Sequence, residues 1–123
     1  KISLGLLNTI SIGSLDAERD WGFAGDYVHG MWLMLQQDSP SDYVIASGRL
    51  HSVRDMCRIA FAHAGLDYQD HVVVDPALVR PPEVVRLVGD PTRAYEDLGW
   101  QPKVSFERLL ELMVDADLAR LQA

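Results

Sequence analysis

Residues 42–74, DYVIASGRLHSVRDMCRIAFAHAGLDYQDHVVV, decide the fold class of this chain of 123 residues. The stretch begins with a nearly continuous apolar run at residues 42–47 and ends with a second run at residues 71–74. Both runs have the length and composition of short strands. Between them, residues 52–64 have the apolar spacing of an amphipathic helix. Short strands separated by helices are typical of α/β and α+β proteins.

Both ends of this central helix carry specific signals. Ser52 is followed three residues later by Asp55, which resembles a shortened capping box and predicts the start of the helix. Gly65 predicts its end, because glycine readily adopts the conformation that terminates a helix. The residues expected to face the interior are Val53, Met56, Cys57, Ala60 and Ala64.

Four further elements are predicted on either side of this stretch. Residues 9–12 alternate polar and apolar side chains before a glycine, which predicts a short strand and a turn. Asp26 is expected to be the N-cap of a helix that extends to about residue 37. Residues 92–98 form a short helix before another glycine, and Ser105 is expected to cap a last helix. The apolar stripe of that last helix comprises Phe106, Leu109, Leu110, Met113, Val114, Leu118 and Leu121.

Two of these elements fit a larger protein. Residues 43–46 are nearly all apolar, which is typical of a strand covered on both faces. The helix at residues 26–37 is apolar on every side, as expected of a helix buried on several sides. The chain also starts at Lys1 without a methionine, so we expect a fragment. We expect residues 26–47 to pack in part against polypeptide that lies outside this chain. Met31, Trp32 or Met34 should therefore be exposed in the chain by itself.

The composition excludes several classes of partner. Eleven basic against 18 acidic residues give a net charge of −7, which argues against non-specific binding to nucleic acid or anionic lipid. No apolar run approaches the roughly 18–20 residues needed to span a bilayer, and no secretory signal is present. The single cysteine, Cys57, fits a reducing compartment, so we expect the protein to be cytoplasmic.

Two arginines in irregular segments are the main candidates for ligand binding. Arg19 lies between two aspartates, and Arg80 precedes two prolines. The planar donor fork of a guanidinium matches phosphate oxygens, so two convergent arginines would suit a diphosphate. Each could instead pair with a nearby carboxylate, Arg19 with Asp16 or Asp20 and Arg80 with Glu83. Spacing alone leaves both explanations open and favours the ion pairs.

The other reactive residues suggest no catalytic site. The four histidines lack the spacing of metal ligands with one another or with Cys57, so no metal site is expected. Cys57 lies on the inner stripe of its helix and is interpreted as a core residue. Trp21, Trp32 and Trp100 are interpreted as packing anchors. No glycine-rich phosphate loop follows a strand, so dinucleotide binding is not expected in this chain.

Motifs throughout the chain resemble known enzymes. The stretches 90–94 (DPTRA), 98–102 (LGWQP) and 104–107 (VSFE) resemble the C-terminal end of extended short-chain dehydrogenase/reductase proteins that act on sugar nucleotides. A second set resembles the GDP-mannose 4,6-dehydratase family more specifically. It consists of residues 13–22 (GSLDAERDWG), 26–28 (DYV), 31–36 (MWLMLQ), 51–54 (HSVR), 80–84 (RPPEV) and 89–90 (GD). The resemblance runs from Lys1 to about Ala119.

This resemblance implies an α/β fold, the C-terminal part of a Rossmann-like protein that contributes mainly its smaller substrate-binding domain. It implies that Arg19 and Arg80 bind the diphosphate of a GDP-sugar, that Glu83 accepts from the ribose hydroxyls, and that the turn at Gly13 lets backbone approach the nucleotide. The chain departs from the family pattern at three positions, where an asparagine, a threonine and an aspartate are expected. Those positions hold Ser14, Pro82 and Val85.

The resemblance also implies a reaction. The family converts GDP-mannose with NADP by oxidising the sugar at C4, eliminating water across C5–C6 and returning the hydride to C6. Its cofactor motif and catalytic residues lie upstream of Lys1, so the chain alone is expected to be inactive and the full-length enzyme to be a homo-oligomer. Two alternatives remain: another sugar-nucleotide epimerase or reductase of the superfamily, and a non-catalytic nucleotide-binding or interaction module.

Overall fold

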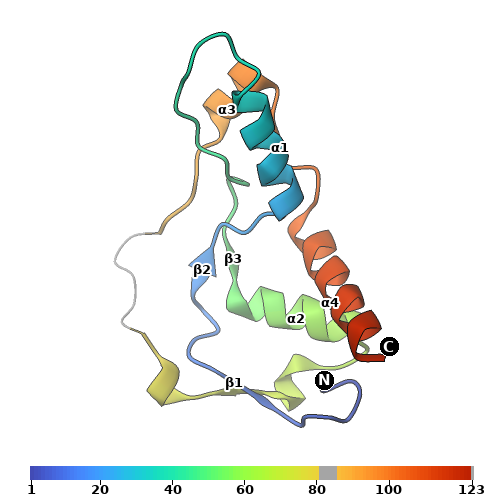
Figure 1. The fold of residues 1–123 in the computed structure, drawn as a ribbon. Helices are drawn as coiled ribbons and strands as arrows, with labels where there is room; N and C mark the ends of the chain where they lie inside the picture. Colours follow the sequence, from blue (N-terminus) through green and yellow to red (C-terminus); the bar gives the residue numbers. More distant parts are fainter. Residues whose placement is uncertain (81–85, 123) are drawn as a thin grey trace. The chain divides into compact units, whose positions relative to one another are not determined.

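The computed structural model describes residues 1–80 and 86–122 (Figure 1). Two compact units make up the chain. The first unit comprises Lys1–Glu18, His51–Val85 and Leu110–Ala123, and the second unit comprises Arg19–Leu50 and Arg86–Leu109. In chain order the elements are β1 (Ile10–Ile12), β2 (Glu18–Arg19), α1 (Ala24–Met34), β3 (His51–Ser52), α2 (Val53–His63), η1 (Tyr68–Asp70), β4 (Val72–Val74), η2 (Pro76–Leu78), α3 (Thr92–Leu98) and α4 (Phe106–Gln122).

A parallel pair of strands, β1 and β4, runs along one side of the first unit (Figure 1). Ile10 lies opposite Val72 and Ile12 opposite Val74. The pairing continues beyond the strands, because the backbone N of Asp75 donates to the carbonyl of Ile12 at 2.9 Å. The strands predicted at residues 9–12 and 71–74 are therefore confirmed.

Local capping fixes both ends of α2, as the sequence predicts. The Ser52 hydroxyl accepts from the backbone N of Asp55 at 3.0 Å, and the Asp55 carboxylate accepts from the backbone N of Ser52 at 3.2 Å. Together these bonds form a complete capping box. Gly65 follows the helix with a φ of +74°, the left-handed conformation that favours glycine.

The second unit is organised around Trp100, whose side chain is 1% exposed. Its indole N–H donates to the carbonyl of Asp26 in α1 at 2.8 Å. The Asp26 carboxylate in turn accepts from the backbone N of Lys103 at 2.9 Å and from that of Val104 at 3.0 Å. A buried carboxylate thus joins α1 to the segment that leads into α4.

The start of α1 differs from the sequence prediction. Phe23, not Asp26, occupies the N-cap position, and Asp26 lies in the first turn with its side chain buried. The helix ends at Met34 rather than near residue 37. The prediction was wrong because the Asp26 side chain binds amides that are distant in sequence, and that contact has no local signature.

The sequence also predicts a strand at residues 42–47, which the structure does not contain. These residues form no strand and belong to neither of the two sheets in the described part of the chain. A strand requires a neighbour for its backbone groups, and here the backbone N of Ser47 donates instead to the carboxylate of Asp20. The prediction was wrong because apolar composition does not supply a partner strand.

The predicted ends of the remaining helices are confirmed. Gly99 terminates α3 with a φ of +64°, and the Ser105 hydroxyl accepts from the backbone N of Arg108 at 3.2 Å at the start of α4. Within residues 1–80 and 86–122, every helix is too short or too polar to cross a membrane.

Candidate functional site

Gly13 follows β1 in a tight turn of the first unit. A Cβ at this position would lie 2.1 Å from the carbonyl oxygen of Leu78 and 3.2 Å from the backbone N of Val79. Only glycine allows this approach without a shift of the backbone. The turn therefore contacts the segment that ends at Arg80, whose side chain is exposed. This contact explains the glycine independently of any bound nucleotide.

The residues after Gly13 are held by the first turn of α2. The backbone N of Arg54 donates to the carbonyl of Leu15 at 2.8 Å, and that of Val53 donates to the carbonyl of Ala17 at 3.0 Å. These donors lack partners inside the helix, so the loop satisfies them. The guanidinium of Arg54 also binds the Asp16 carboxylate at 2.8 Å. The hydrogen bond to Asp16 raises the pKa of Arg54.

Arg19 is exposed at the end of β2, which pairs with β3. The next residue, Asp20, accepts from the backbone N of Ser47 at 2.9 Å and from that of Gly48 at 2.9 Å. Trp21 then stacks on Phe106 with ring centroids 5.5 Å apart. An exposed cation is therefore followed directly by two anchored residues.

The two carboxylates suggested as ion-pair partners of Arg19 both bind other groups. Asp16 pairs with Arg54, and Asp20 accepts hydrogen bonds from backbone amides. Arg19 belongs to the second unit and Arg80 to the first. Glu83, Pro82 and Val85 lie outside the described residues.

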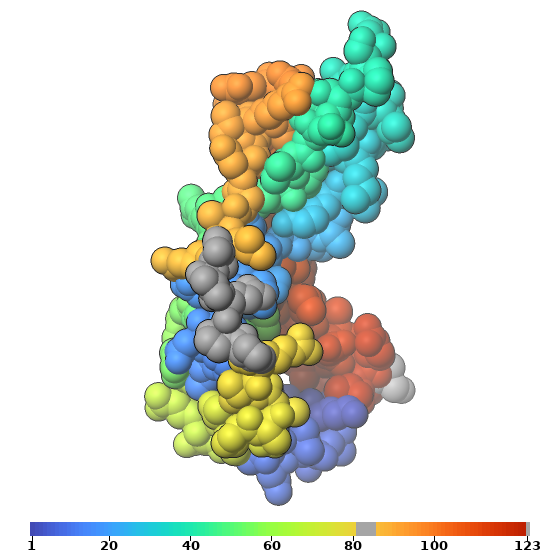
Figure 2. Space-filling model, turned by 90° about the vertical axis from the view of Figure 1, so that its left-hand side faces the viewer, coloured from blue at the N-terminus to red at the C-terminus, as the bar shows by residue number. Residues whose placement is uncertain are grey.

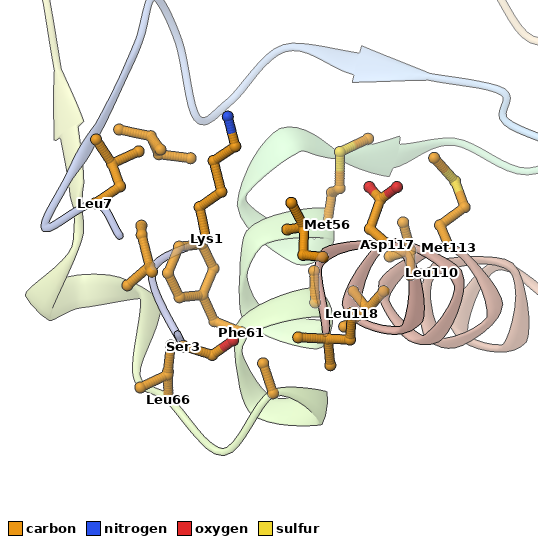
Figure 3. Close-up of a pocket in the computed structure, with 16 residues that line it drawn as sticks. Lys1, Ser3, Leu7, Met56, Phe61, Leu66, Leu110, Met113, Asp117 and Leu118 are labelled. Carbon is orange, nitrogen blue, oxygen red and sulfur yellow. The ribbon is translucent and has the colours of Figure 1, made fainter. Parts of the chain in front are cut away.

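Sequence reasoning missed a cavity of about 430 Å³ in the first unit (Figure 3). Its lining combines the inner stripes of α2 and α4 with the N-terminal segment, and includes Met56, Phe61, Leu110 and Leu118. Lys1 and Asp117 are its only charged lining residues. The cavity is too apolar for a diphosphate, which needs cationic or amide donors. Both stripes were recognisable from the sequence, but not the space between them.

His63 and Cys57, both in the first unit, have structural roles. His63 lies 2.7 Å from Asp115, and Cys57 is buried, which raises the pKa of its thiol. A buried thiol with a raised pKa is a poor nucleophile, in agreement with its interpretation as a core residue. The described ranges contain no group of three histidine, cysteine or acidic residues placed to hold a metal.

One face of α1 is apolar and exposed. Val28, Met31, Trp32 and Leu35 recur at helical spacing at or just beyond the helix, and the side chain of each is more than half exposed. In Figure 2 the atoms of this helix, in blue to cyan, lie at the surface beside the orange atoms of α3. The expected exposure of Met31 and Trp32 is confirmed, whereas Met34, which was also expected to be exposed, is half-buried. Trp32 is not a packing anchor within this chain, unlike Trp100.

Comparison with known proteins identifies the family. A family model described as GDP-mannose 4,6 dehydratase matches residues 1–113. The chain belongs to the GDP-mannose 4,6-dehydratase family. It is 50% identical over 118 residues to GDP-mannose 4,6 dehydratase 1 of Arabidopsis thaliana, covering 96% of this chain and 33% of that protein. It is 45% identical over 135 residues to the human GDP-mannose 4,6 dehydratase, covering 96% of this chain and 36% of the relative.

Solved structures support the expected fold. RMD from Pseudomonas aeruginosa, determined in complex with NADPH, matches with a TM-score of 0.85 at 21% identity, over 97% of this chain and 39% of that one. UDP-glucose 4-epimerase from Thermotoga maritima, determined with UDP-glucose, matches with a TM-score of 0.79 at 28% identity, over 98% of this chain and 37% of that one. The chain therefore has the α/β fold of part of an extended short-chain dehydrogenase/reductase. It spans about a third of the length of the curated relatives it matches.

Proposed function

We propose that this chain supplies the nucleotide-sugar-binding side of a GDP-mannose 4,6-dehydratase, an NADP-dependent lyase that converts GDP-mannose to GDP-4-keto-6-deoxymannose. The observation that carries the proposal is the family match over residues 1–113. Identity at 45–50% to relatives named for this activity favours the dehydratase over an epimerase or reductase. The 28%-identical UDP-glucose 4-epimerase supports only the wider superfamily.

Arg19 and Arg80 bind the diphosphate of GDP-mannose in this proposal. Both side chains are exposed, and each lies next to backbone that is held in place: Arg19 precedes the anchored Asp20, and Arg80 follows the segment packed on Gly13. A hydrogen bond to a charged group contributes about 1.5–3 kcal/mol, so two arginines are a sufficient source of diphosphate affinity in a complete cleft. Gly13 brings backbone close to the nucleotide, and Glu83 accepts from the ribose.

The described residues do not fit NADP. A dinucleotide requires a glycine-rich turn between a strand and a helix that opens toward the pyrophosphate. Here the glycine after β1, Gly13, is followed by a loop to β2 and not by a helix. The oxidation and elimination steps are therefore assigned to polypeptide outside this chain, and the chain alone is inactive.

The exposed face of α1 packs against a cofactor-binding domain in the complete enzyme. The face consists of Val28, Met31, Trp32 and Leu35, each more than half exposed. Contiguous apolar surface of this kind marks an interaction site in soluble proteins. We further propose that the protein is a cytoplasmic homo-oligomer; its single free cysteine, Cys57, supports a reducing compartment.

Product analysis separates the candidate functions. The full-length product of the gene, incubated with GDP-mannose and NADP, is expected to yield GDP-4-keto-6-deoxymannose, detected by mass as the loss of one water. An epimer of unchanged mass would indicate an epimerase instead. Binding without any turnover would indicate the interaction module.

Calorimetric titration then tests the binding site. GDP-mannose is expected to bind the 123-residue chain no tighter than about 1 mM, because association costs at least ~4 kcal/mol and the rest of the cleft is absent. The full-length product is expected to bind far more tightly and to lose affinity in Arg80→Ala. A micromolar dissociation constant for the 123-residue chain, abolished by Arg80→Ala, would show instead that the site is self-contained.

A further inference from the structure

We propose that Asp20 is a positioning residue that holds Arg19 where it binds the substrate diphosphate. The inference rests on the proposed function, since Asp20 acts here only through Arg19. Its basis is the set of hydrogen bonds made by one carboxylate immediately after an exposed cation.

The Asp20 carboxylate joins two segments that are distant in sequence. Oδ1 accepts from the backbone N of Ser47 at 2.9 Å and from the Ser47 hydroxyl at 2.5 Å. Oδ2 accepts from the backbone N of Gly48 at 2.9 Å and from that of Gly89 at 3.3 Å. All of these residues belong to the second unit. Residue 20 is thus fixed by four hydrogen bonds to its carboxylate.

The local backbone is suited to these bonds. Gly48 has a φ of +74°, which side-chain-bearing residues rarely adopt. A Cβ at Gly89 would lie 2.2 Å from the Cβ of Ala46, so only glycine permits that approach. Two positions at which a larger residue would be strained therefore present their amides to Asp20.

These hydrogen bonds hold the backbone next to Arg19 in place. The stacking of Trp21 on Phe106 holds it as well. Fixing this backbone sets the position from which the exposed Arg19 side chain extends. Binding groups need placement to within about 0.5 Å for full effect, so loosening this anchor should reduce affinity without removing the cation.

Asp20→Asn is the substitution that tests these hydrogen bonds most specifically. A carboxylate has two acceptor oxygens, whereas an amide has one acceptor and a nitrogen that only donates. Asp20→Asn therefore keeps the size of the side chain but places an N–H₂ against the amides of Ser47 or of Gly48 and Gly89. Asp26→Asn is the matched control, because Asp26 is also a carboxylate of the second unit that accepts from two backbone amides, but it is not adjacent to Arg19.

The experiment is a double-mutant cycle on the full-length product of the gene, with GDP-mannose affinity as the readout. We expect Arg19→Ala to weaken binding by about 10–100-fold, the equivalent of one charged hydrogen bond. We expect Asp20→Asn to weaken it by about 10-fold. In the Arg19→Ala background, Asp20→Asn should produce no further loss, because the group that it positions is gone. Asp26→Asn should leave the affinity of the folded protein unchanged.

Each other outcome has a distinct meaning. An equal loss from Asp20→Asn with and without Arg19 would show a general structural role and overturn the inference, as would unchanged affinity in Asp20→Asn. Unchanged affinity in Arg19→Ala would instead contradict the proposed role of Arg19 itself. Should Asp20→Asn not fold, Ser47→Ala removes the hydroxyl bond to Asp20 together with the bonds between that hydroxyl and the backbone of Arg49. Its expected loss of about 2–3-fold should likewise vanish in Arg19→Ala.

Discussion

The helices α1 and α2 are both 11 residues long, yet they are held in different ways. The ends of α2 are fixed by Ser52, Asp55 and Gly65, which are adjacent to the helix or within its first turn. α1 has no side-chain cap and depends on contacts from Asp26 to Trp100 and to the amides after it. A helix with local caps can therefore be predicted from its own residues. A helix anchored by distant groups cannot.

Truncation of Trp100 should destabilise α1 and the second unit more than any other substitution considered below. Trp100→Ala is expected to destabilise the protein by about 3–5 kcal/mol, because it empties the largest buried site and removes the anchor of α1. Trp100→Phe keeps most of the packing but loses the indole bond to Asp26, so a smaller loss of about 1–2 kcal/mol is expected. Urea denaturation measures both. Equal losses would show that the hydrogen bond, rather than the packing, carries the anchor.

Gly13→Ala should have the next largest effect, on the loop that receives the first turn of α2. The added methyl would lie 2.1 Å from the carbonyl oxygen of Leu78, so the segment that ends at Arg80 must shift. The expected destabilisation is about 1–3 kcal/mol. Gly65→Ala is the control, since a Cβ there meets no atom within 4 Å and only its φ of +74° is strained. Native GDP-mannose affinity in Gly13→Ala would contradict the link between this turn and Arg80.

Loss of the α2 cap should be milder and dependent on pH. Ser52→Ala is expected to cost about 1 kcal/mol at pH 7, the usual value for an N-cap.

Hydrogen bonds from Ser52 hold the pKa of Asp55 below its ordinary value. Because the pKa of Asp55 is lower in the folded than in the unfolded state, its ionisation stabilises the protein at pH values above the unfolded-state pKa of about 4. That stabilisation is lost as the pH falls through the folded-state pKa. The difference between wild type and Ser52→Ala should therefore narrow below about pH 4. Denaturation series at pH 7 and pH 3 would detect it, and a constant difference would contradict the role of Asp55.

The smallest effect is expected on the exposed face of α1. Met31→Gln should change the stability of the 123-residue chain by less than about 0.5 kcal/mol, because the side chain is 57% exposed. In the full-length product it should cost more, since the proposed cofactor domain covers this face. Thermal unfolding of both lengths tests the difference. A small effect in both would remove the support for packing at this face.

Local signals account for the parts of the structure that the sequence predicts. The capping box of α2, the glycine after α3 and the strands β1 and β4 were all predicted from adjacent residues. The role of Asp26 and the conformation of residues 42–47 were not, because both depend on amides far away in the chain.

The candidate site shows the same limit. The types of residue that suit a diphosphate, Arg19 and Arg80, were identifiable from their composition and setting. Spacing could not show that Asp16 pairs with Arg54 or that Asp20 binds three backbone amides. Those contacts arise only when segments distant in sequence meet.

The parallel pairing of β1 with β4 has a consequence for the order of folding. About half of the chain lies between the two strands, including all of Arg19–Leu50 from the second unit. Closing so long a loop carries an entropic cost that must be met before the strand contacts form, and such contacts slow folding. α2 needs only neighbouring residues and can form early. We therefore expect refolding to show fast helix formation followed by a slower phase in which β1 and β4 join, so that the turn at Gly13 and the approach to Arg80 are completed late.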